Sequence, residues 1–199
     1  MNYKNTKEGF KYLFIASILM IVSEFSSLFN GTENQTLKVI GVIVVLVGVV
    51  GFFMSLKGLK LCAQDDSGFN QAYLFALIGL VVGLIGSIIS GIFKIEWLKH
   101  FTQTAINFCD FMIVWQVLTT SAYILDKKGN EQLAEKARGT SYLFLACFVV
   151  TLLFSYYQID AANQLLLFAA GLIAVATAVI GIIGEVKYFL FVKEMKDAL

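Results

Sequence analysis

The chain has 199 residues, of which 58% are apolar and 15% are charged, and its formal net charge is +1. Its mean hydropathy of +0.78 exceeds that of an ordinary soluble domain, and the near-zero net charge gives no reason to expect a nucleic-acid partner. We therefore expect an integral membrane protein whose main partner is the lipid bilayer, folded as a single domain over residues 1–199.

Six stretches of the chain are long and apolar enough to cross a hydrocarbon core of roughly 30 Å. The first has the length of a span and no small-residue cleavage pattern after it, so we expect it to remain as a helix. The sequence thus predicts an all-α, polytopic membrane helical bundle with six transmembrane helices. The predicted spans are residues 11–30, 37–56, 71–93, 103–125, 141–158 and 164–186.

The distribution of basic residues predicts the orientation of the bundle. Twelve of the fifteen lysines and arginines lie at the ends of the spans that also hold the two termini, and only Lys38, Lys94 and Lys99 lie at the opposite ends. Short cytoplasmic loops carry an excess of positive charge. We therefore expect both termini in the cytoplasm and the chain in the plasma (inner) membrane.

Two charged segments lie between or at the end of the predicted spans. We expect residues 126–140 to be a charged connector, and a short interfacial or solvated helix, suggested by Leu133, Ala134 and Ala137 among the charges, is the alternative. Residues 185–199 alternate aromatic and charged side chains, so we expect an amphipathic tail at the membrane surface.

Three of the predicted spans begin alike. Tyr-Leu-Phe follows a glycine at residues 12–14, 73–75 and 142–144, each time at the expected cytoplasmic end of a span. This similarity predicts a helical hairpin used three times in the same orientation. The alternative is that aromatic residues gather at membrane surfaces in any case.

The third span carries a stripe of small residues. Gly79, Gly83, Ser87 and Gly91 recur every four residues and so share one face of a helix. Small residues allow a second helix to approach closely. We expect this face to pack inside the chain, and a homo-oligomer contact is the alternative.

The fourth span carries a row of polar residues. His100, Gln103, Asn107 and Asp110 follow the spacing i, i+3, i+7, i+10, which keeps them on one face of a helix. A central charge costs roughly 2.5–3.5 kcal/mol on membrane-insertion scales. Asp110 is therefore expected to face protein or water rather than lipid.

A second acid, Glu24, lies at a matching depth in the first span, and polar residues between 155 and 164 extend the same rim. The pattern predicts an outward-facing polar vestibule whose candidate ligand-binding residues are Glu24, His100, Gln103, Asn107 and Asp110. In the alternative explanation, Asn107 and Asp110 fix helix register by hydrogen bonds while Glu24 reaches the outer interface.

The sequence lacks hydrolase, metalloprotease and nucleotide-loop motifs, so no catalytic residue and no cofactor is expected. One histidine and three cysteines without paired spacing predict neither a metal site nor a disulfide framework. The preferred interpretation is non-enzymatic binding or transport of a small polar or cationic ligand through the vestibule. The alternative is a structural or accessory membrane subunit that associates with another membrane protein and has no ligand.

Overall fold

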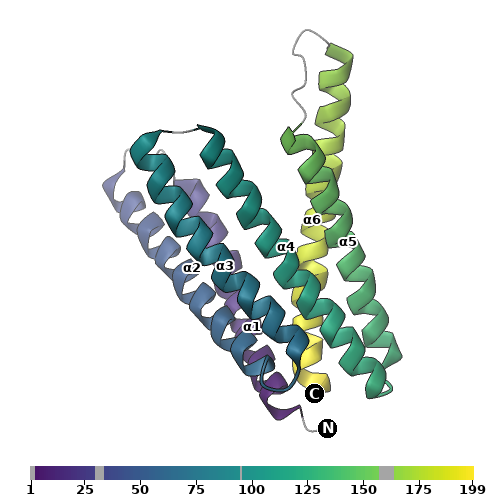
Figure 1. Ribbon diagram of the computed structural model, residues 1–199. Helices are drawn as coiled ribbons and strands as arrows, with labels where there is room; N and C mark the ends of the chain where they lie inside the picture. Colours follow the sequence, from purple (N-terminus) through teal and green to yellow (C-terminus); the bar gives the residue numbers. More distant parts are fainter. Residues whose placement is uncertain (1–2, 30–33, 95, 157–163) are drawn as a thin grey trace. The chain divides into compact units, whose positions relative to one another are not determined.

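The computed structural model describes residues 3–29, 34–94, 96–156 and 164–199, and all regular structure in these ranges is helical (Figure 1). This confirms the predicted all-α class. The elements are α1 (Lys4–Glu24), the 3-10 helix η1 (Phe25–Phe29), α2 (Gln35–Cys62), α3 (Ser67–Phe93), α4 (Glu96–Lys127), α5 (Glu131–Tyr156) and α6 (Gln164–Ala198).

Among the described residues, the five helices α2 to α6 are each long and apolar enough to cross a membrane. They coincide with the second to sixth predicted spans, and together they indicate an integral membrane protein in a lipid bilayer. The remaining helix, α1, is not one of these five, so the first predicted span stays a prediction. The threefold hairpin repeat also stays a prediction.

The helices form two compact units. Unit 1 comprises Met1–Tyr73 and Val192–Leu199, and unit 2 comprises Leu74–Phe191. Because α3 and α6 run through the boundaries, each of these helices contributes to both units. Fully buried side chains occur in both units, for example Phe10 and Phe69 in unit 1.

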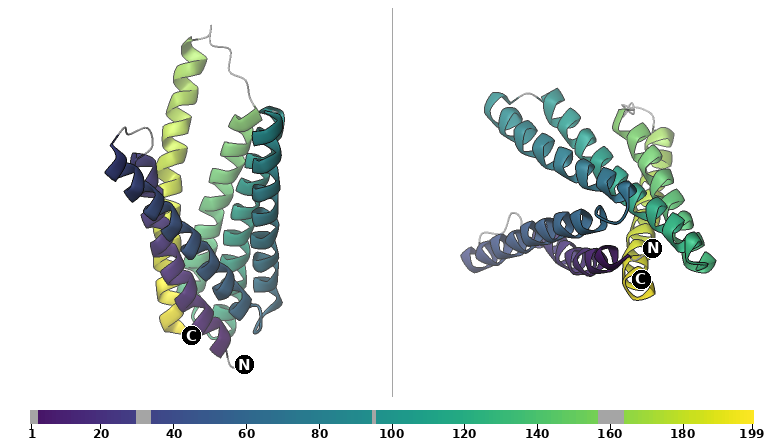
Figure 2. Two further views of the ribbon diagram at one scale, coloured as in Figure 1. Left: turned by 90° about the vertical axis from the view of Figure 1, so that its left-hand side faces the viewer. Right: turned by 60° about the horizontal axis from the view of Figure 1, so that its bottom comes forward.

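In unit 1, α1 and α2 are an antiparallel pair that packs closely where Gly9 faces the end of α2 (Figures 1 and 2). A Cβ atom on Gly9 would lie 2.6 Å from the carbonyl oxygen of Gly58, and one on Gly58 would lie 2.8 Å from the carbonyl oxygen of Gly9. Only glycine therefore fits at these two positions. The rings of Phe10 and Phe69 meet edge to face at a centroid distance of 6.0 Å, which attaches the first turn of α3 to α1.

Two adjacent acids of unit 1, Asp65 and Asp66, cap different helices. The carboxylate of Asp65 accepts hydrogen bonds from the Asn5 amide at 3.0 Å, the Thr6 backbone N–H at 2.7 Å and the Thr6 hydroxyl at 2.9 Å. Asp66 accepts from the Gly68 backbone N–H at 2.9 Å. Both carboxylates satisfy N–H groups that a helix start leaves unpaired. They tie the beginning of α1 to the beginning of α3.

In unit 2, a compact turn joins α4 to α5. Gly129 has a φ of +76°, its N–H bonds to the Asp126 carbonyl at 3.0 Å, and the Asn130 N–H bonds to the Leu125 carbonyl at 2.9 Å. These are the two bonds of a Schellman motif. The Asn130 side chain then accepts from the Leu133 N–H at 3.3 Å and begins α5. Residues 131–140 are therefore the first turns of α5, not a connector.

The C-terminal segment differs from the expected surface tail. The helix α6 continues to Ala198 without a break, and Val192 and Met195 are fully buried. The ammonium of Lys196 lies 5.0 Å from the ring centroid of Phe14 on α1. The apolar side of this segment is thus covered by protein, because it packs within the chain.

Candidate functional site

All four polar residues of the predicted row lie on α4, in unit 2. The Gln103 amide donates to the Asn107 side-chain oxygen at 2.9 Å, one helical turn away. His100, Gln103 and Asp110 are exposed, and Asn107 is half-buried. The first half of α4 therefore presents two linked amides, an imidazole and a carboxylate on one side of the helix.

Asp110 is the acidic group of this face. Its side chain is exposed, and within the ranges that the structure describes its carboxylate forms neither a hydrogen bond nor an ion pair. Its neighbour Cys109 points to another side of the helix, is buried and faces Gly79 of α3. The carboxylate of Asp110 is thus available to a partner from outside the described chain.

One side of α4 packs against the glycines of α3. A Cβ atom on Gly79 would lie 3.1 Å from the Cβ of Cys109, and one on Gly83 would lie 3.4 Å from Ile106. The tightest contact belongs to Gly86, where a Cβ atom would lie 2.9 Å from the Cβ of Thr102. This side of α4 holds α3 at the same depth as the polar row.

Only two of the four residues of the predicted small-residue stripe on α3 contact α4. Gly79 and Gly83 face α4, whereas Ser87 is exposed and a Cβ atom on Gly91 would meet nothing within 4 Å. Gly86 occupies the position that the four-residue spacing assigned to Ser87. Sequence reasoning missed Gly86 because an α-helix has 3.6 residues per turn, so a strict four-residue spacing drifts away from the face that Gly79, Gly83 and Gly86 share.

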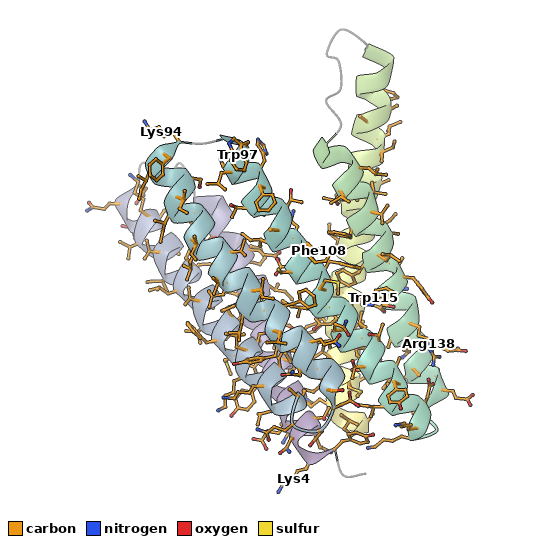
Figure 3. The ribbon with its side chains drawn as sticks, in the orientation of Figure 1. Lys4, Lys94, Trp97, Phe108, Trp115 and Arg138 are labelled. Carbon is orange, nitrogen blue, oxygen red and sulfur yellow. The ribbon has the colours of Figure 1, made fainter. Side chains whose placement is uncertain are left out.

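Another side of α4 packs against α5 through aromatic rings. Phe111 stacks on Phe148 with centroids 4.5 Å apart, Phe108 lies 6.0 Å from the same ring, and Trp115 meets Tyr142 at 6.4 Å. Figure 3 shows Phe108 and Trp115 following one another along α4. Near the end of the helix, Asp126 pairs with Arg138 of α5. These contacts fix α5 along most of α4.

The polar row occupies a third side of α4. At about 100° of rotation per residue, it is turned by roughly 100° from both the α3 contact and the α5 contact. The same third side continues into the second half of α4, where Val117, Leu118, Ser121, Ile124 and Leu125 are all 0% exposed. One helix face is therefore polar and largely exposed in residues 100–110, which we call the open half, and fully buried in residues 117–125, which we call the sealed half.

Ser121 is a polar residue of this sealed half that the sequence analysis did not select. Its hydroxyl is buried and has no hydrogen-bond partner among the described residues. The signal was present, because Ser121 follows Asp110 at i+11 and so shares its helix face. Its burial depends on tertiary packing and could not be read from spacing.

The remaining candidate, Glu24, ends α1 in unit 1 and is exposed. Since the other four residues belong to unit 2, the pairing of the two carboxylates stays a prediction. The polar residues expected on the rim between 157 and 163 lie outside the described residues.

Within the described ranges, no group of three histidine, cysteine, aspartate or glutamate residues could hold a metal ion. Comparison with protein-family models, with curated proteins and with solved structures found no match to this chain.

Proposed function

We propose that this protein is not an enzyme and that it binds or transports a small polar or cationic ligand at the polar face of α4. The observation that carries the proposal is the exposed Asp110 carboxylate, which has no partner among the described residues. Ionisable residues within membrane spans are rare and mark ligand or ion pathways. Asp110 supplies the negative charge, and the linked amides of Gln103 and Asn107 supply hydrogen bonds.

We propose further that the site opens to the outside of the membrane. The polar half of α4 begins near Lys94 and Lys99, whereas the sealed half ends at Lys127 and Lys128 and belongs to the side that is rich in basic residues. The positive-inside rule then assigns the sealed half to the cytoplasmic side. In this proposal, the buried residues around Leu118 separate the site from the cytoplasmic side.

The test is thermal unfolding of the full chain in detergent with a panel of cationic probes: sodium, potassium, ethanolamine, choline and spermidine chlorides. One class of probe is expected to raise the unfolding midpoint of the wild-type protein and of Glu135→Gln, which removes an exposed acid from α5. Asp110→Asn is expected to fold and to lose the rise. A rise that persists in Asp110→Asn, or a panel without effect on the wild-type protein, contradicts the proposal.

A second candidate function is that of an accessory membrane subunit without a ligand. It is favoured by one face of α6, where Cβ atoms on Gly171 and Gly181 would meet nothing within 4 Å and where Ala174 and Ala178 are exposed. Such small residues let another transmembrane helix approach. Here, a partner protein should copurify with the wild-type chain and be lost with Ala174→Trp, while Asp110→Asn retains it.

A further inference from the structure

A pair of hydrogen-bonding groups lies where α2 leaves its apolar stretch, in unit 1. The ammonium of Lys57 donates to the Tyr12 hydroxyl at 2.8 Å and lies 4.2 Å from the centroid of the Tyr12 ring. No charged residue occurs between Val39 and Leu56. Lys57 is therefore the first charge that α2 presents at this end of its membrane segment.

The pair retains hydrogen-bond donors. Because the Tyr12 oxygen accepts from Lys57, its own O–H is directed elsewhere, and the ammonium has two further N–H groups. These donors suit the oxygens of a phosphate, which accept charge-assisted hydrogen bonds. The exposed Lys11 and Lys60 flank the pair, and the acid on this side of α1 is Glu8, one turn before Tyr12. Positive charge thus prevails around the pair.

An apolar track leads away from the pair along α2. Leu46, Val50 and Phe53 follow at helical spacing on the same side of α2 as Lys57, and they are 57%, 52% and 59% exposed. A cationic donor pair at the head of an exposed apolar stripe matches the two chemistries of a phospholipid. Free phosphate would use the donors alone, whereas a phospholipid would also contact the apolar surface of α2, which is exposed beyond these three residues as well.

We propose that Lys57 and Tyr12 bind the phosphate of an anionic phospholipid, whose acyl chain lies along the stripe formed by Leu46, Val50 and Phe53. Lys11 and Lys60 add attraction for the net negative headgroup. Basic residues next to a membrane attract anionic lipid. The surface therefore selects anionic over zwitterionic lipid.

The test is native mass spectrometry of the full chain in neutral detergent, titrated with dioleoylphosphatidylglycerol or with dioleoylphosphatidylcholine. We expect tighter binding of the anionic lipid, a loss of about fivefold in affinity for Lys57→Gln and of about threefold for Tyr12→Phe. Lys57→Arg, which keeps the charge, should lose less than Lys57→Gln. The matched control is Lys38→Gln, which removes a charge from the opposite end of α2 and should bind like the wild-type protein.

Three results overturn the proposal: unchanged binding of the anionic lipid by both Lys57→Gln and Tyr12→Phe, an equal loss for Lys38→Gln, or full competition by inorganic phosphate. The last result would assign the pair to a soluble anion. Circular dichroism checks that each variant is folded, and Tyr12→Phe keeps the ring, so the test stands even if Lys57→Gln does not fold.

Discussion

The two halves of α4 use one helix face in opposite ways. In residues 100–110 this face carries an imidazole, two amides and a carboxylate and is largely exposed. In residues 117–125 it carries mostly aliphatic side chains and is fully buried. The helical spacing is the same in both halves, so the difference in burial comes from the tertiary packing around each half.

The open half is not loosely packed. At the depth of the polar row, α4 is held to α3 through Gly79 and Gly86 and to α5 through the stacked Phe111 and Phe148. Most of the buried residues of α4, however, lie between residues 117 and 125. The α3 and α5 contacts hold the open half of α4 on two sides, and the polar side chains lie on the third side.

The largest expected effect is a difference in the free energy of unfolding between a variant in the sealed half and a variant in the open half. Leu118→Ala in the sealed half should lower the free energy of unfolding by about 2–4 kcal/mol, because it removes buried methyl groups and leaves a cavity. Phe101→Ala, at a residue of the open half that is 59% exposed, should lower it by less than about 1 kcal/mol. Unfolding in mixed micelles measures the free energy of unfolding of both variants. Equal decreases for the two variants would contradict the difference in packing between the two halves of α4.

A smaller effect tests how firmly the open half is supported. Gly86→Ala should lower the free energy of unfolding by about 1–3 kcal/mol, since its Cβ would collide with Thr102 and force α3 away from α4. Gly91→Ala, on the same helix with nothing near it, is the control and should lose nothing. A neutral Gly86→Ala would mean that α3 does not hold this half.

The smallest expected effect is an increase, rather than a decrease, in the free energy of unfolding. Ser121→Ala should raise the free energy of unfolding by up to about 1 kcal/mol, because it removes a buried hydroxyl that has no partner in the described chain. Thr119→Val is the control, since the Thr119 hydroxyl already bonds the Trp115 carbonyl at 2.8 Å. A marked loss of stability in Ser121→Ala would show that the sealed half holds a polar partner.

Periodicity and apolar length predicted the helices and the polar row, because both depend on local spacing along the chain. The start of α5 escaped prediction, since charged residues 131–140 hid a helix whose beginning is fixed by the backbone turn at Gly129 and Asn130. The C-terminal segment was expected at the membrane surface because its periodicity does not say what covers Val192 and Met195.

The sequence predicted which residues share the face of the candidate site, but it did not predict which of them are buried. Spacing alone placed Gln103, Asn107 and Asp110 on one face, and the same spacing extends to Ser121. Which part of that face is sealed depends on how the helices pack, as does the contact at Gly86. These are properties of the tertiary structure that the sequence of one helix does not contain.

The most direct test is cysteine accessibility along this face, after Cys62, Cys109 and Cys147 are replaced by alanine. Single cysteines at residues 103, 107, 110, 117 and 121 would be treated with a charged thiol reagent in membranes open on both sides. Labelling is predicted at 103, 107 and 110 and protection at 117 and 121. Protection at 110, or labelling at 117 and 121, would contradict a water-accessible site above a sealed half.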